Sequence, residues 1–149
     1  MKTWTARSHF NAPIERVFDL TTDPRRMRDM FPTIEAISDV RGGGDAAGDS
    51  FRFRDRLLGR TITGTTVVTA ALRPILQTTE TTYADGTRLT WTMRFREASG
   101  GTDVHNEVVY EPPAGPLTRL RANLGGLFVE RRLRRSAERF DQMLARPIR

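Results

Sequence analysis

Cysteine is absent from this chain of 149 residues, and lysine is nearly absent. The lack of cysteine excludes a disulfide scaffold, a thiolate nucleophile and a metal held by cysteine. No apolar run reaches the roughly eighteen residues that cross a bilayer. None follows a basic region near the amino terminus either, so we expect no signal peptide. The sequence predicts a single cytoplasmic domain over residues 1–149 that uses no metal and no cofactor.

Arginine carries the positive charge of the chain, since Lys2 is the only lysine among 24 basic residues. The formal net charge is +6, and residues 115–146 hold eight arginines against three acidic residues. Such a basic segment suits an anionic membrane surface, RNA or an acidic carrier protein. Nucleic acid is disfavoured, because the basic run 129–140 has no aromatic residue outside its apolar stripe. A solvated outer helix face is the alternative, and the sequence leaves the oligomeric state open.

Alternating apolar and polar residues predict seven strands in this chain. Turn residues separate them, among them the pairs Asp85-Gly86 and Gly100-Gly101. No connection between the last six strands is long enough for a crossover helix, so these strands should pair antiparallel. The predicted strands cover residues 2–10, 33–40, 51–58, 60–72, 75–83, 87–97 and 102–111.

Three helices are predicted around these strands. Residues 13–22 form a short amphipathic helix that starts at a proline, and residues 23–31 form a second with Asp23 as its cap. After residue 116, leucines and phenylalanines at helical spacing predict one long amphipathic helix, in which Gly125-Gly126 indicate a kink or a close approach of the backbone to another group. A curved seven-stranded antiparallel sheet with this helix across its concave side is an α+β fold.

With this order of elements, the chain resembles the START-like superfamily, and in particular its polyketide cyclase/dehydrase and lipid-transport group. The resemblance covers residues 3–145 and rests on "NAPIERVFDLTTDP", Gly48, "VVTAALRPILQTT" and "GGTDVHNEVVYEPP". It implies a helix-grip fold, in which the last strand lies beside the first and the long helix covers a ligand cavity. Members of the family either carry lipids and hormones or cyclise polyketides, and they share no universal catalytic motif.

The inward strand rows are mainly apolar with a few polar groups, which is the lining of a small-molecule pocket. We expect these residues to contact a hydrophobic, oxygenated or aromatic ligand. The alternative is a filled core, whose polar groups bond to one another. The candidate ligand-binding residues are Trp4, Phe51, Phe53, Thr66, Gln77, Thr79, Leu89, Trp91, Met93, Phe95 and Val108 on the strands, with Leu124 and Phe128 on the long helix.

Four inward polar residues are candidate catalytic groups: Asp55, Tyr83, Asn106 and Tyr110. A desolvated Asp55 could act as a general acid or base, while the other three could move protons or bind carbonyl oxygens. These are the steps that dehydration and aldol-type ring closure require. The alternative is that Asp55 is solvated at a strand end or paired with an arginine, and that the tyrosines serve in packing.

His9 and His105 are the only histidines, and both lie on outward rows of the first and last strands. If these strands are neighbours, the two side chains lie close together on the outer surface. Two histidines without a third ligand make a weak metal site, so we expect ordinary surface residues. The loop 42–48, "GGGDAAG", lacks the Gly-Lys-Ser/Thr ending of a phosphate loop and leads into a strand.

Three functions are therefore compatible with the sequence. The chain could be a polyketide cyclase, aromatase or dehydratase that holds a flexible substrate in one reactive conformation. It could instead be a carrier or sensor that binds a lipid or pigment without changing it. The third function is an interaction module whose basic helix binds RNA or a membrane.

Overall fold

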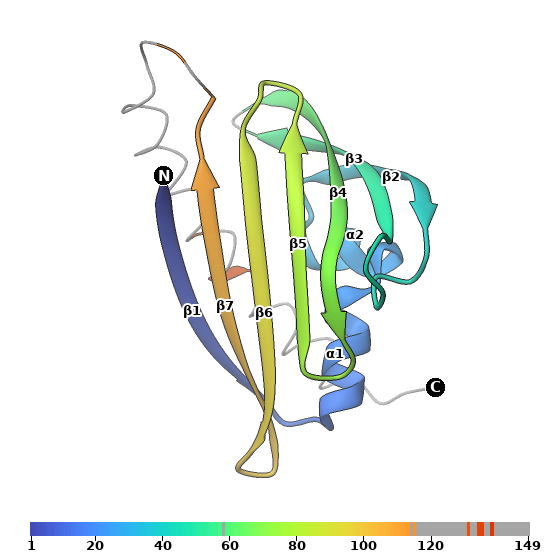
Figure 1. The fold of residues 1–149 in the computed structure, drawn as a ribbon, viewed down its shortest axis with the longest axis vertical. Helices are drawn as coiled ribbons and strands as arrows, with labels where there is room; N and C mark the ends of the chain where they lie inside the picture. The colour runs from blue at the N-terminus through green and yellow to red at the C-terminus, as the bar shows by residue number, and fades with distance from the viewer. Residues whose placement is uncertain (58, 114, 116–130, 132–133, 136–137, 139–149) are drawn as a thin grey trace.

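The computed structural model describes residues 1–57, 59–113, 115, 131, 134–135 and 138. Within them, one antiparallel sheet has the strand order β1-β7-β6-β5-β4-β3-β2 (Figure 1). Each predicted strand is present, and its ends differ from the prediction by no more than a single residue. The strands are β1 (Lys2–Phe10), β2 (Ile34–Arg41), β3 (Ser50–Leu57), β4 (Arg60–Leu72), β5 (Leu76–Tyr83), β6 (Arg88–Ala98) and β7 (Gly101–Glu111).

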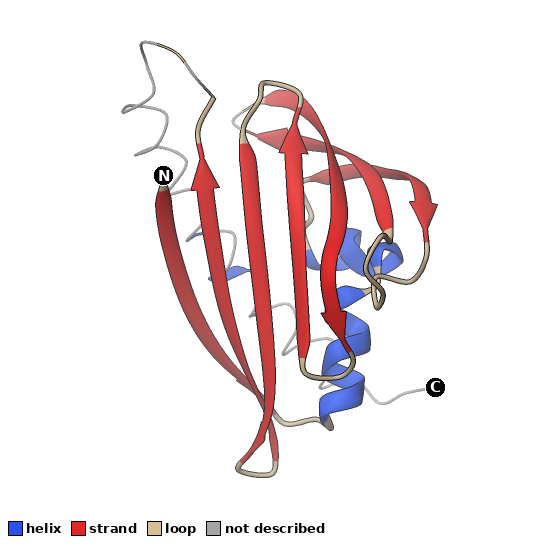
Figure 2. Ribbon diagram, in the orientation of Figure 1, coloured by secondary structure: helices blue, strands red, loops and turns tan. Residues whose placement is uncertain are grey.

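The two predicted short helices follow β1. Helix α1 (Ile14–Thr22) buries the apolar side that its spacing predicts. The second begins as a 3-10 turn, η1 (Pro24–Arg26), and continues as α2 (Met27–Met30). The Asp23 side chain accepts a hydrogen bond from the backbone N–H of Arg25 at 3.0 Å, which confirms Asp23 as the cap. Both helices lie on one side of the sheet (Figure 2), where α1 contacts β6 and β7 and α2 contacts β2.

Aromatic contacts join these helices to the sheet. Phe18 of α1 is fully buried, and its ring meets that of Phe95 on β6 edge to face, with ring centroids 5.1 Å apart. Phe31, directly after α2, meets Trp91 on β6 at 5.9 Å. Burying large aromatic side chains in this way is the main source of stability in a domain of this size. The helices therefore fill one part of the concave face.

The first and last strands are neighbours, as the resemblance implied. Strand β1 pairs with β7 from Lys2 opposite Tyr110 to Phe10 opposite Thr102. The Thr102 hydroxyl donates to the carbonyl of Ala12 at 2.8 Å, so the connection from β1 to α1 is fixed against β7.

The turn between β6 and β7 is Ser99-Gly100, and the prediction of Gly100-Gly101 was wrong by one residue. Ser99 and Gly100 have φ values of 47° and 75°, which suit a two-residue hairpin turn. Gly101 belongs to β7, where a side chain would collide with the carbonyl of Phe10. The close packing of this position against Phe10 explains why it is a glycine.

The long carboxy-terminal helix was predicted over a segment that lies largely outside the described residues. Leu124, Phe128 and the predicted kink at Gly125-Gly126 lie outside them as well, as does most of the basic run 129–140. An acidic carrier protein or a membrane surface as a partner of that run stays a prediction.

Candidate functional site

The concave face of the sheet carries the side chains that alternation predicted. On β3, Phe51, Phe53 and Asp55 are buried, whereas Arg52 and the arginines that follow it in alternate positions are exposed. On β6 and β7, the predicted inward rows also face the core, with Phe95, Val104 and Val108 buried. The predicted facing of both rows is confirmed.

Burial is uneven across this face. Its side toward β3, β4 and the helices is closed, since Phe51, Phe53, Val68 and Phe95 are at most 7% exposed. Toward β1, β7 and β6, several inward side chains keep part of their surface accessible beside the buried Val104 and Val108. These half-buried residues are Trp4, Ala6, Leu89, Trp91, Met93 and Asn106. The accessible part of the concave face therefore lies beside β1, β7 and β6.

Asn106 is the polar group in the middle of this accessible wall. On one side it pairs with Ala6 of β1, and on the other with Met93 of β6. Its Oδ1 accepts a hydrogen bond of 2.8 Å from the indole N–H of Trp91. Because an indole nitrogen only donates, this bond fixes which end of the amide faces Trp91. The amino group therefore points the other way, and it has no hydrogen-bond partner among the described residues.

Asp55 is completely buried, with 0% of its surface exposed. It pairs with Ile34 of β2 and Ile62 of β4, so both neighbouring strands place an apolar residue beside it. The alternative that Asp55 is solvated at a strand end is wrong. A carboxyl group at such a position is costly to bury unless it is hydrogen-bonded or paired.

The two tyrosines are buried at the same end of the sheet as Asp55. Tyr83 meets the ring of Phe53 edge to face at 5.5 Å, and Tyr110 meets that of Trp4 at 5.8 Å. Asp55 and Tyr110 lie four strands apart, or roughly 19 Å along the sheet at about 4.8 Å per strand. Asp55, Tyr83 and Tyr110 are thus distributed along one rim of the concave face, and with Asn106 they do not form one compact group.

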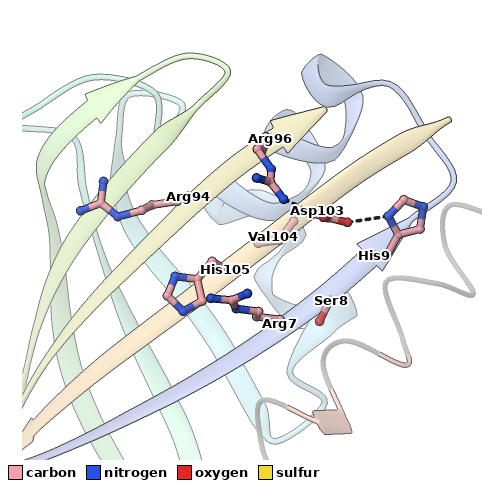
Figure 3. Close-up of a pocket in the computed structure, with 8 residues that line it drawn as sticks. All are labelled: Arg7, Ser8, His9, Arg94, Arg96, Asp103, Val104 and His105. Atoms are coloured by element: carbon pink, nitrogen blue, oxygen red, sulfur yellow. Dashed lines mark hydrogen bonds and ion pairs between the residues drawn. The ribbon is translucent and has the colours of Figure 1, made fainter. Parts of the chain in front are cut away.

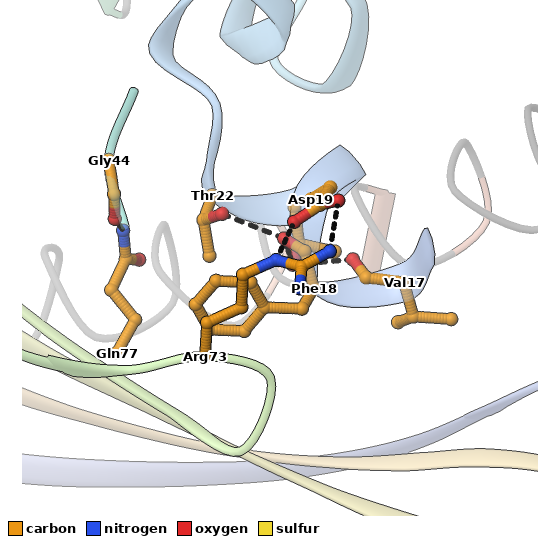
Figure 4. Close-up of polar contacts among 8 residues, drawn as sticks. Val17, Phe18, Asp19, Thr22, Gly44, Arg73 and Gln77 are labelled. Carbon is orange, nitrogen blue, oxygen red and sulfur yellow. Dashed lines mark hydrogen bonds and ion pairs between the residues drawn. The ribbon is translucent and has the colours of Figure 1, made fainter. Parts of the chain in front are cut away.

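Besides Trp91, two predicted ligand-binding residues have hydrogen-bond partners within the protein. The Thr66 hydroxyl is hydrogen-bonded to that of Thr81 on β5 at 2.8 Å. Gln77 is 3% exposed, and its Nε2 donates to the carbonyl of Gly44 at 2.6 Å (Figure 4). Gln77 therefore holds the glycine-rich loop against β5. Thr79 lies between Gln77 and Thr81 on the inward row of β5, and it is half-buried.

The glycine-rich loop binds a carboxylate of the protein itself. Asp49 Oδ2 accepts hydrogen bonds from the backbone N–H groups of Gly44 at 3.0 Å and Ala46 at 3.2 Å. A phosphate-binding loop would offer such N–H groups to its ligand. Here an aspartate at the end of the loop takes that place.

The turn between β4 and β5 is held to α1 by an ion pair (Figure 4). Arg73 donates from Nε and Nη2 to the two carboxylate oxygens of Asp19, each at 2.9 Å. These hydrogen bonds hold the pKa of Asp19 below its ordinary value, although partial burial opposes them. The pair ties the carboxy-terminal half of α1 to this turn.

The two histidines lie on the outward face, as predicted. His9 Nδ1 lies 2.6 Å from Asp103 Oδ1, and the side chains are 37% and 40% exposed. The hydrogen bond from His9 lowers the pKa of Asp103 against the opposing effect of burial, and Arg96 adds to the lowering. Within the described part of the chain, no group of three or more possible ligands could hold a metal ion.

A family model described as "Polyketide cyclase / dehydrase and lipid transport" matches residues 1–145. The chain belongs to this family. It is therefore a member of the START-like superfamily, and the curved sheet with two short helices fits the helix-grip fold. No curated protein matches the chain.

Solved structures with this fold are similar to the polyketide cyclase/dehydrase chain along most of its length. TTHA0849 from Thermus thermophilus is 17% identical, with 96% of this chain and 97% of that one covered and a TM-score of 0.80. Ms6760 from Mycobacterium smegmatis is 18% identical, with coverages of 99% and 93% and a TM-score of 0.72. DynU16 from the dynemicin biosynthetic locus is 16% identical, with coverages of 97% and 47% and a TM-score of 0.63. At these identities the likeness shows the fold.

Helices that could cross a membrane were sought among the described residues, and none is long and apolar enough.

Proposed function

We propose that this chain binds a hydrophobic small molecule that carries a carbonyl or another oxygen acceptor. The ligand lies against the accessible part of the concave face, beside β1, β7 and β6. The observation that carries the proposal is the Trp91–Asn106 hydrogen bond, which fixes the amide so that its amino group faces away from the indole.

The amino group of Asn106 carries two N–H donors. Of their neighbours, Ala6 has no side-chain acceptor and leaves room beside the amide, and Met93 offers only a weakly accepting thioether sulfur. A ligand that covers this wall without an acceptor would leave these donors unsatisfied, which costs about 1–3 kcal/mol. A ligand with a well-placed oxygen avoids this cost. Asn106 therefore selects for oxygenated ligands, while Trp4, Leu89 and Trp91 supply apolar contact area.

A pair of ligands with the same shape tests this selection. In 2-acetylnaphthalene the side chain has a carbonyl oxygen, and in 2-isopropenylnaphthalene a methylene group replaces it. Isothermal titration calorimetry should show that the wild type binds the acetyl compound about tenfold more tightly, as expected for one hydrogen bond to a buried donor. The Asn106→Leu variant should bind both compounds with similar affinity.

Asn11 offers a matched control, because it is exposed and lies in the connection after β1. The Asn11→Leu variant should keep the wild-type preference. Equal binding of the two compounds by the wild type would contradict the role of Asn106. Failure of both compounds to bind at their solubility limits would contradict an accessible apolar site on this face.

Catalysis is a second candidate function, supported by the complete burial of Asp55 on the same face. A buried carboxyl group could transfer protons during ring closure or dehydration of a bound polyketide, with Tyr83 at the same rim. Turnover of a confirmed substrate by Asp55→Asn and Tyr110→Phe tests it, and unchanged rates would remove both residues from the mechanism. A co-purified ligand that mass spectrometry recovers unchanged after long incubation would favour a carrier.

A further inference from the structure

A hollow of about 440 Å³ lies on the outward face of the sheet, on the opposite side from the proposed ligand site (Figure 3). It spans β1, β7 and β6, which lie side by side there. Arginines and histidines make up most of its lining, with a single carboxylate among them. The lining residues are Arg7, Ser8, His9, Arg94, Arg96, Asp103, Val104 and His105.

One row across this hollow has its charges balanced internally. His9 of β1 pairs with Asp103 of β7, which pairs in turn with Arg96 of β6. Asp103 lies between the two basic residues and accepts from both, at 2.6 Å from His9 and 3.4 Å from Arg96. This row therefore needs no anion from solution.

The next row across the three strands contains basic groups and no acid. Arg7 of β1 pairs with His105 of β7, which pairs with Arg94 of β6. None of these three side chains makes an ion pair or hydrogen bond with another described residue. Glu107, the next outward residue of β7, lies opposite Thr5 and Thr92 and forms no ion pair with a described residue either. The fold thus places one arginine on either side of His105, and no acidic side chain in the described part of the chain pairs with any of the three.

We propose that the row Arg7–His105–Arg94 binds the phosphate group of a small soluble molecule. The two guanidinium charges repel each other across the intervening strand, and a bound dianion would replace this repulsion by attraction to both. The backbones of Arg7 and Arg94 are about 10 Å apart, two strand spacings. Their long side chains can converge over His105. A phosphate has enough oxygens for both guanidinium groups and the imidazole N–H, whereas a carboxylate has only two.

The test measures binding of inorganic phosphate by calorimetry, with sodium chloride adjusted to hold the ionic strength constant. The Arg7→Gln and Arg94→Gln variants should each bind phosphate about tenfold more weakly, since each removes a charge-assisted hydrogen bond. Arg60→Gln is the matched control, because it removes the same charge from an exposed position at the start of β4. This variant should bind phosphate as the wild type does.

Thermal unfolding gives a second readout that does not depend on the calorimetry. Without phosphate, Arg7→Gln and Arg94→Gln should unfold at the same temperature as the wild type or higher, because repulsion is removed. Phosphate should raise the melting temperature of the wild type and of Arg60→Gln, and raise that of the other two variants less. A purely structural role of these arginines would instead give lower melting temperatures without phosphate.

Two results would overturn the proposal. One is phosphate binding that is absent, or equal in all four proteins. The other is binding only to phosphatidylcholine vesicles that contain phosphatidic acid, without binding to inorganic phosphate, which would assign the row to a lipid surface. Since this site and Asn106 lie on opposite faces, the outcome is independent of the ligand-binding tests above.

Discussion

Replacing Gly64 by alanine should destabilise the protein, although alanine is normally the better residue in a strand. Gly64 lies on β4, opposite Phe53 of β3 and Tyr83 of β5. A Cβ atom there would lie 2.5 Å from Cζ and 2.9 Å from Cε1 of Phe53. The Phe53 ring lies over the glycine, is 7% exposed, and packs edge to face against Tyr83. The added methyl group therefore has to displace a buried ring.

Two opposing effects set the size of this change. Overpacking a core costs typically about 1–3 kcal/mol, whereas glycine to alanine at an unstrained position stabilises by about 0.4–1 kcal/mol through the unfolded chain. The net destabilisation should be about 1–2 kcal/mol. At about 2–4 °C per kcal/mol for a chain of this length, the melting temperature should fall by about 2–8 °C.

A double-mutant cycle separates the collision from any other effect of the methyl group. Phe53→Leu removes the ring atoms and leaves only the Thr82 carbonyl oxygen, 3.1 Å from the new Cβ, so Gly64→Ala should cost much less in that background. Gly43→Ala is the control, because the nearest atom to its Cβ would be 3.5 Å away. Urea unfolding of the four proteins of the cycle gives the coupling energy. Equal effects of Gly64→Ala in both backgrounds would refute the reasoning.

Two further predictions concern the contacts around the loops. Asp19→Asn removes the ion pair with Arg73. Because the side chains of Asp19 and Arg73 are 55% and 45% exposed, the loss in free energy of unfolding at neutral pH should stay below about 1 kcal/mol. Because the pKa of Asp19 lies below its ordinary value of 3.8, this contribution is present above that pH and is lost as the pH falls through the folded-state pKa. Urea unfolding from pH 7 to pH 2 should show the two proteins converging in acid, and a constant difference would contradict the pair. Gln77→Leu leaves the buried carbonyl of Gly44 without its hydrogen-bond donor and should lower the free energy of unfolding by about 1–3 kcal/mol. Urea unfolding measures this change. An unchanged midpoint would show that the 2.6 Å contact does not stabilise the protein.

The strands and short helices could be predicted because their signals are local. Alternation along residues 87–97 placed Leu89, Trp91 and Met93 on one face, and the structure has them there. Asp23 and Pro24 marked the start of the second helix for the same reason. The neighbouring positions of β1 and β7 came from the resemblance, since no local pattern states which strands pair.

The polar contacts of the site could not be predicted, because they depend on register and on distant pairs. The Trp91–Asn106 bond is diagonal across β6 and β7, and moving the turn from Ser99-Gly100 to Gly100-Gly101 would have placed other residues opposite each other. Gln77 was predicted to bind ligand, and its amino group instead binds a loop 33 residues away in the sequence. The row Arg7–His105–Arg94 also needs three strands in register before it exists.

The proposed role of Asn106 is tested most directly by the side-chain amide signals of that residue in ¹⁵N–¹H NMR spectra. They are assigned as the pair missing from Asn106→Leu. Saturating 2-acetylnaphthalene should shift the Asn106 amide protons downfield, while 2-isopropenylnaphthalene should not, because only the first offers an acceptor to Nδ2. Binding of 2-acetylnaphthalene that leaves these signals unmoved would contradict the proposed site.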